Sequence, residues 1–185
     1  MLFNSYTFLL LFLPLALSGF LLLRRASYRL TVVWLGIASL AYYGYWNPNP
    51  AMPWSAQWLG LILGSCVFNF FVGRQLSRRQ AGPHRKPARK PPLLIIGVVA
   101  NLTLLAIFKY AGLFAKTAEW LGATGIPAPQ FILPLGISFF TFQQIAYLVD
   151  ARRGETKEYH FTDYLLFVSF FPQLIAGPIV HHKEM

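Results

Sequence analysis

Two adjacent histidines near the end of the chain, His181 and His182, are the residues best suited to acid–base chemistry, because histidine exchanges protons near neutral pH. Neighbouring residues on a helix or strand point in different directions, so the pair does not converge on one substrate atom. Apart from Glu184, no carboxylate stands three or four residues away to orient either ring. We therefore rank both as weak catalytic candidates and favour a polar turn. The lone Cys66 gives no cysteine-cluster metal site, and we predict no metal.

A more unusual group of polar residues lies within one apolar stretch, residues 131–150, next to the helix breaker Pro134. The stretch carries four hydrogen-bonding side chains at apparent membrane depth: Ser138, Thr141, Gln143 and Gln144. Buried amides are unfavourable unless they are hydrogen-bonded, so the two glutamines need protein partners or water. The four residues therefore either line a substrate tunnel or hold neighbouring helices together, and the sequence leaves both readings open.

The two glutamines are not expected to play the same part, because successive residues on a helix are about 100° apart. One should face a cavity while the other bonds to a neighbouring helix. We favour Gln143 as the lining residue, since it shares a helix face with Gly136. Two further polar residues in apolar runs, Asn69 and Asn101, are expected to hydrogen-bond between helices.

The composition indicates which elements position these residues. Of the 185 residues 56% are hydrophobic and only 12% charged, against about 25% charged in a soluble domain, and the mean hydropathy is +0.49. This balance excludes soluble Rossmann, nucleic-acid-binding and disordered classes. About six apolar segments are candidates to cross roughly 30 Å of hydrocarbon: residues 6–23, 30–46, 54–73, 93–108, 131–149 and 162–180.

We predict an all-α integral membrane protein in which these segments are transmembrane or re-entrant helices of one polytopic domain, 1–185. The last two segments contain Pro and Gly, so part of residues 131–180 should be re-entrant or broken. Residues 109–122 carry charged side chains along one helical face and aromatic and aliphatic side chains along the other. That pattern predicts an interfacial amphipathic helix.

The basic residues predict the orientation of the chain in the membrane. Of the 16 Lys and Arg, 13 lie in three blocks, within residues 24–29, 74–90 and 152–157, and each block follows an odd-numbered segment. The positive-inside rule makes these loops cytoplasmic and places the N-terminus outside. The loop at 74–92 has no interleaved aromatic residues and no glycine-rich phosphate cradle, so we expect contact with anionic lipids and no nucleic acid.

Two late motifs carry a resemblance to a known family. The stretch PLGISFFTFQQIAYLVD (134–150), followed by FFPQLIAGP (170–178) and HHKEM (181–185), resembles the membrane-bound O-acyltransferase family. The alginate O-acetylation branch is the most similar, and teichoic acid D-alanyl transfer proteins are more distant. The opening MLFNSYTFL (1–9) and YYGYW (42–46) are also similar to that branch, so the resemblance covers essentially the whole chain.

The resemblance implies a multi-pass enzyme of the bacterial inner membrane, with a partial fold of this family. It would transfer an acyl group, such as acetyl, from a cytoplasmic acyl-CoA or acyl carrier to an extracytoplasmic polysaccharide such as alginate. No bound cofactor is implied, and the implied partners are membrane lipids, the polysaccharide and periplasmic acetylation proteins. Family members are more than twice as long, and their catalytic histidine would lie beyond Met185. We therefore expect an N-terminal portion that is inactive alone.

Two other classes of function fit the residues. Polar side chains in broken helices also form binding sites in small membrane transporters or transport subunits. However, the sequence has no evident inverted repeat and no carboxylate deep in a span. A non-catalytic membrane scaffold that uses its basic loop for docking is the other alternative.

Overall fold

The computed structural model describes residues 5–45, 56–80, 92–122, 134–156 and 160–176. Within these ranges every regular element is a helix, which confirms the all-α class for this part of the chain. The elements are the π-helix η1 (Phe8–Phe12) and the α-helices α1 (Leu13–Leu23), α2 (Tyr28–Tyr45), α3 (Ala56–Gln80), α4 (Pro92–Trp120), α5 (Ile137–Arg153), α6 (Phe161–Ser169) and α7 (Phe171–Ala176).

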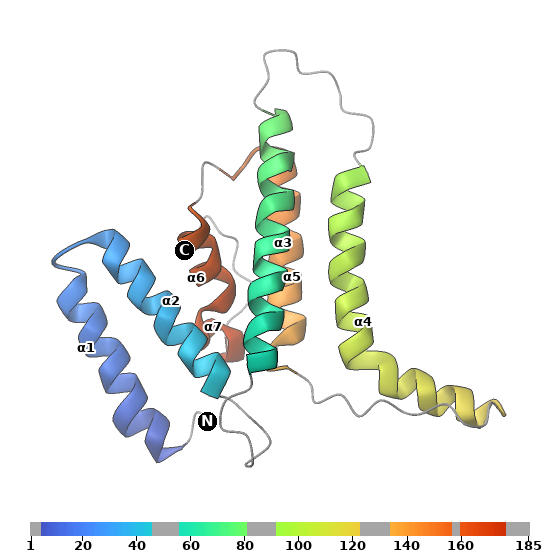
Figure 1. Ribbon diagram of the computed structural model, residues 1–185, viewed down its shortest axis with the longest axis horizontal. Coiled ribbons are helices and arrows are strands. Elements are labelled where there is room, and N and C mark those ends of the chain that lie inside the picture. The colour runs from blue at the N-terminus through green and yellow to red at the C-terminus, as the bar shows by residue number, and fades with distance from the viewer. Residues whose placement is uncertain (1–4, 46–55, 81–91, 123–133, 157–159, 177–185) are drawn as a thin grey trace.

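Three long helices, α3, α4 and α5, form the centre of the arrangement, while α6, α2 and α1 lie to one side of it (Figure 1). Helices α3 and α5 run parallel, because Ser65 contacts Gln144 near one end and Ser77 contacts Thr156 at the other. Helix α4 runs antiparallel to α3, as the contacts of Asn101 with Asn69 and of Gly97 with Val72 show. The centre is therefore an up-down-up triplet of helices.

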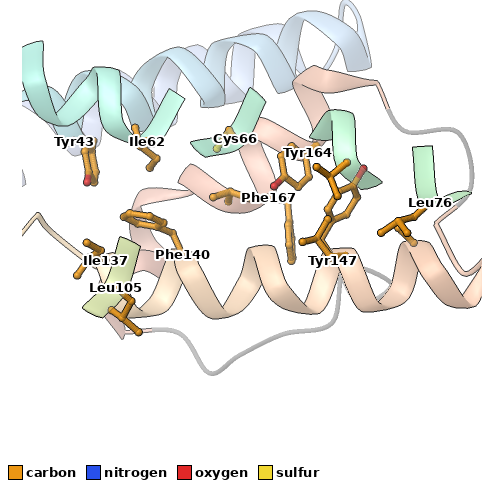
Figure 2. Packing of buried hydrophobic residues seen from close by; sticks show 14 residues of the cluster. Tyr43, Ile62, Cys66, Leu76, Leu105, Ile137, Phe140, Tyr147, Tyr164 and Phe167 are labelled. Atoms are coloured by element: carbon orange, nitrogen blue, oxygen red, sulfur yellow. The ribbon is translucent and has the colours of Figure 1, made fainter. Parts of the chain in front are cut away.

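The main core lies between α3, α5 and α6, with contributions from α2 and α4 (Figure 2). Its fully buried members include Ile62, Phe140, Leu148 and Val168, none of which exposes any measurable surface. A smaller aromatic cluster of Phe8, Tyr42 and Phe171 joins η1, α2 and α7. The main core holds α5, the helix that carries the polar residues of the stretch 131–150.

The segment predicted as a separate interfacial helix is the second part of α4, which bends and turns away from α3 and α5 (Figure 1). No proline lies between residues 93 and 126, so nothing in the sequence ends the helix at residue 108. Both faces of this part are largely open: Lys116 and Glu119 are exposed, and so are Phe114 and Trp120, at 65% and 85%. An exposed aromatic face of this kind suits a bilayer interface.

The glycines that flank α5 stand at its two ends and do not interrupt it. Gly136, at φ 65°, precedes the first residue, and Gly154, at φ 74°, follows the last, both in the left-handed region that glycine adopts at little cost. A break does occur further along, at Phe170, whose ψ of 109° separates α6 from α7. The expectation that residues 131–180 include a broken helix is therefore confirmed.

Two helices in the described ranges are long and apolar enough to cross a bilayer, with candidate spans at Leu59–Arg78 and Pro92–Trp120. The apolar helix at Phe8–Leu23 is shorter. The remaining predicted crossings stay predictions.

The C-terminal ends of α1, α3 and α5 all point toward the same side of the molecule, the upper side in Figure 1. Arg24 follows α1, Arg78 lies near the end of α3, and Arg152 near the end of α5. This common side is the arrangement that the cationic blocks require, and its cytoplasmic location stays a prediction of the positive-inside rule.

Cysteine labelling tests this orientation. With Cys66 replaced by serine, a Gln80→Cys variant should stay unlabelled by an impermeant thiol reagent in intact cells and should react once the cells are permeabilised. A Gly125→Cys variant, on the predicted outer side, is the matched control and should react in intact cells. Labelling of Gln80→Cys from outside would show that the orientation is inverted.

Candidate functional site

A network of buried polar side chains joins the three central helices. The amide oxygen of Gln144 on α5 accepts hydrogen bonds from Ser65 Oγ at 2.6 Å and from Asn69 Nδ2 at 2.8 Å, both on α3. Asn69 and Asn101 exchange two further bonds, at 3.1 Å and 2.6 Å, between α3 and α4. The predicted interhelical bonding of the two asparagines is therefore confirmed.

The network is well satisfied, although it is almost completely removed from solvent. Asn69 and Gln144 expose no surface and Asn101 only 2%. Asn101 also donates to Gly97 O at 2.8 Å, and the amide nitrogen of Gln144 lies 3.5 Å from Cys66 Sγ. Because every amide in it has partners, the network reads as a structural clamp of α3, α4 and α5.

Close helix approach accompanies the clamp. A Cβ at Gly73 on α3 would overlap the ring of Tyr147, and a Cβ at Gly97 on α4 would lie 2.7 Å from Leu148 Cδ1. Both partners belong to α5, so the two glycines let α3 and α4 pack closely on it, as small residues do between membrane helices. The clamp and the close contacts together fix the rotation of α5.

Gln143, the residue directly before Gln144 on α5, has the opposite environment. Only 1% of its surface is exposed, yet neither its amide oxygen nor its amide nitrogen has a hydrogen-bond partner in the described part of the chain. Thr141 Oγ1 is also buried without a partner, whereas Ser138 is half-buried. The structure therefore separates a bonded glutamine from an adjacent glutamine whose hydrogen-bonding groups are unused.

The four predicted lining residues do not share one face of α5. Ser138 and Gln143 are five residues apart, which corresponds to about 140° around a helix. Tyr147, one turn beyond Gln143, contacts Tyr164 of α6, with ring centroids 4.3 Å apart and ring planes tilted by 44°. Because Tyr147 also packs against Gly73 of α3, Gln143 lies toward the side of α5 where α3 and α6 both approach it, while the amide of Gln144 bonds to α3.

Three further buried groups without a described partner are not among the candidates named from the sequence: the hydroxyls of Tyr43 and Tyr164 and the amide of Gln173. A glutamine in an apolar run is the signal that singles out Gln143, and it applies equally to Gln173. A tyrosine in an apolar run gives no such signal, because tyrosine also belongs to cores and interfacial belts.

The number of unsatisfied groups matters energetically. Seven buried side-chain atoms lack a partner among the described residues. At about 1–3 kcal/mol each, they would together cost about as much as the whole net stability of an ordinary domain, roughly 5–15 kcal/mol. Groups outside the described residues, water or a ligand are the partners that could lower this cost.

The weak catalytic candidates His181 and His182 lie outside the described residues. Among the residues that the structure does describe, the one histidine is His160, which is exposed just before α6. Asp163 lies in the first turn of α6, where a carboxylate interacts favourably with the helix dipole. The described part of the chain therefore offers polar side chains for binding, and no buried histidine that could act as a base.

Comparisons with known proteins identify relatives over the whole chain. It is 37% identical to a peptidoglycan O-acetyltransferase from Helicobacter pylori, covering 38% of that protein, and 36% identical to a probable alginate O-acetylase from Pseudomonas aeruginosa, covering 34%. A teichoic acid D-alanyltransferase from Lacticaseibacillus rhamnosus is 24% identical over 66% of the chain. No family model and no solved structure matches.

The chain spans little more than a third of the length of the first two relatives, and the similarity runs from its first part to its last. Relatives at 32–37% identity over all of its residues are named as a peptidoglycan O-acetyltransferase and as probable alginate O-acetylases. The chain belongs to the membrane-bound O-acyltransferase family.

Proposed function

We propose that the protein is an O-acyltransferase of the bacterial inner membrane that acylates, and specifically acetylates, an extracytoplasmic polymer such as alginate or peptidoglycan. The observation that carries this proposal is the 36–37% identity, over the whole chain, to two proteins named for O-acetylation of those polymers. None of the relatives described above is named as a transporter or a scaffold.

In the proposed reaction the donor is a cosubstrate, either an acyl-CoA or an acyl carrier, supplied from the cytoplasm. A hydroxyl oxygen of the polymer attacks the thioester carbonyl carbon, an ester bond forms and the carbon–sulfur bond breaks. The hydroxyl proton passes through a base to the leaving thiolate. By the family resemblance this base is a histidine beyond Met185, and periplasmic acetylation proteins assist on the acceptor side.

The polar residues of α5 have two parts in this proposal. Gln143 supplies hydrogen-bonding groups along the route on which donor and acceptor meet, whereas Ser138 and Thr141, which lie on other faces of α5, stay lining candidates from the sequence alone. Gln144, proposed from the sequence as a further lining residue, holds α5 to α3 beside that route. The support for this division is that Gln143 and Thr141 have unused polar atoms, while the amide oxygen of Gln144 already accepts two bonds.

Deletion of the gene that encodes this chain is the direct test. We expect the O-acetyl content of one surface polymer, either the exopolysaccharide or peptidoglycan, to fall to the level of a strain without O-acetylation. Mild alkaline release of acetate from each purified polymer measures it. A transporter or a scaffold without a role in acylation predicts unchanged acetate in both polymers, and that result would contradict the proposal.

Complementation tests the expectation that residues 1–185 do not act alone. Returning the intact gene should restore acetylation, whereas a gene that expresses only residues 1–185 should not. If that shortened gene did restore acetate release, and His181→Ala or His182→Ala abolished it, the base would be one of these two histidines.

A further inference from the structure

Helix α4 carries one stripe of mainly apolar side chains along its whole length. The members of the stripe recur every three or four residues and so share one face of the helix: Ile95, Val99, Leu102, Ala106, Tyr110, Leu113, Thr117 and Trp120. In the first part of α4, Ile95 and Val99 expose 55% and 53% of their surface, and in the second part Leu113 exposes 58%. The stripe therefore continues from the first part of α4 into residues 109–120, which we call the arm.

The opposite face of α4 packs on the protein. Gly97 and Asn101 are buried against α5 and α3, and Leu105 and Ala115, the other buried residues of α4, lie on the same face. The stripe thus points away from α3 and α5, and the arm turns toward that same side (Figure 1). Because α4 bends toward its exposed face, the stripe lines the inner angle between the first part of the helix and the arm.

The length of α4 requires such an arm. Its 29 residues are about 43 Å long at about 1.5 Å per residue, whereas the hydrocarbon of a bilayer is about 30 Å thick. The last turns of the helix therefore pass beyond a straight crossing, although the apolar stripe does not stop there. An arm that lies in the plane of the membrane keeps its part of the stripe in contact with hydrocarbon.

The polar side chains of the arm agree with this placement. Thr117, the one hydroxyl amino acid of the stripe besides Tyr110, donates its proton to Leu113 O at 2.9 Å, so it presents no unused donor to an apolar surrounding. Lys109 and Lys116 lie along one edge of the stripe, and Lys109 Nζ is 5.4 Å from the centre of the Tyr110 ring. Lysines at the edge of an apolar face extend their ammonium groups to the level of the lipid phosphates.

We infer that the inner angle of α4 is a phospholipid site, in which acyl chains lie along the stripe and Lys109 and Lys116 bind the lipid phosphates. The stripe offers few hydrogen-bonding groups to a protein or a polysaccharide, and the charges along this edge have the sign that phosphate requires. Lipid held in this angle keeps the arm in the plane of the membrane and fixes the depth of α4.

Spin labels test the inference, because oxygen concentrates in hydrocarbon whereas a water-soluble nickel chelate does not enter it. In a Cys66→Ser background, the full-length protein is labelled at Leu113→Cys or Thr117→Cys and placed in nanodiscs of phosphatidylglycerol and phosphatidylcholine. The ratio of oxygen to nickel collision rates should be at least about threefold higher at these positions than at Glu119→Cys, and close to that at Val99→Cys. All four positions are exposed, so cysteine replaces no buried side chain.

Two results would overturn the inference. Nickel access at positions 113 and 117 equal to that at Glu119→Cys would place the stripe of the arm in water. Exclusion of both reagents, together with an immobilised nitroxide spectrum, would show that a protein partner or a second copy of the chain covers the arm.

Charge reversal tests the two lysines. In a Lys109→Glu/Lys116→Glu variant, repulsion from anionic headgroups should move the arm toward water, so nickel access at Leu113→Cys should rise about twofold in nanodiscs rich in phosphatidylglycerol. Lys109→Arg/Lys116→Arg keeps both charges and should retain the parent value. Unchanged nickel access in the glutamate variant would overturn the assignment of the phosphates to these lysines.

Discussion

Replacing Gln144 with leucine is expected to destabilise the protein by about 1–3 kcal/mol while the folded molecules keep their activity. Leucine removes the oxygen that accepts from Ser65 and Asn69, and each such bond in a membrane protein contributes roughly 0.6–2 kcal/mol. The hydroxyl of Ser65, which is partly buried, is then left without that acceptor, which adds to the loss. The loss should appear as a lower Tm and a smaller monodisperse fraction after extraction in mild detergent.

The control for this prediction is an adjacent residue of the same type. Gln143→Leu makes the same chemical change one position earlier on α5, at a side chain with no partner among the described residues. If both leucine variants lowered the Tm equally, the clamp of α3, α4 and α5 would not be the source of the effect. Equal stability of the Gln144→Leu protein and its parent would show that the network contributes nothing.

Gln143→Leu is expected to have the opposite profile, with activity per folded molecule reduced roughly tenfold and little change in the folded fraction. The reason is that the amide has no hydrogen-bond partner in the described part of the chain. If it bonds to a substrate, as the proposed function requires, its removal misplaces a reacting group without loosening the helices. Acetate released from the polymer, divided by the amount of folded protein in the membrane, measures the effect in a strain that carries only the variant gene.

A conservative variant distinguishes positioning from packing. Gln143→Glu keeps the shape and the acceptor oxygens but loses the amide donor, and should restore only part of the lost activity. Gln143→Met keeps the length without strong hydrogen-bonding groups and should behave as leucine does. Normal activity per folded molecule in Gln143→Leu would exclude Gln143 from the substrate route and leave it as a packing residue.

Much of this arrangement could be predicted from local sequence. The apolar runs predict helices because a polar backbone in hydrocarbon must bond to itself, and the asparagines at 69 and 101 predict a link between helices for the same reason. The break near Phe170 is expected because Pro172, Gly177 and Pro178 come soon after it in the sequence. Each of these inferences needs only the residue type and its neighbours along the chain.

What the sequence does not reveal depends on rotation and on distant partners. Gln143 and Gln144 have the same side chain in the same run, and only the packing of α5 on α3 gives one of them Ser65 and Asn69 as donors. The continuity of residues 109–120 with the preceding span is not evident from the sequence, because a change from an apolar to an amphipathic pattern resembles the end of a helix. The pattern of polar and apolar side chains changes where a helix leaves the protein core, whereas the helix itself ends only where its backbone hydrogen bonding is interrupted.

The reciprocal bonds between Asn69 and Asn101 bear on how the chain enters the bilayer. Because α3 and α4 are consecutive and antiparallel, each asparagine can satisfy the other as soon as this hairpin has left the ribosome. The hairpin can thus partition into lipid with its two amides already matched, when α5 has yet to be synthesised. Gln144 then docks onto the preformed pair of asparagines. The buried amides are thus paired in the same order in which their helices are synthesised.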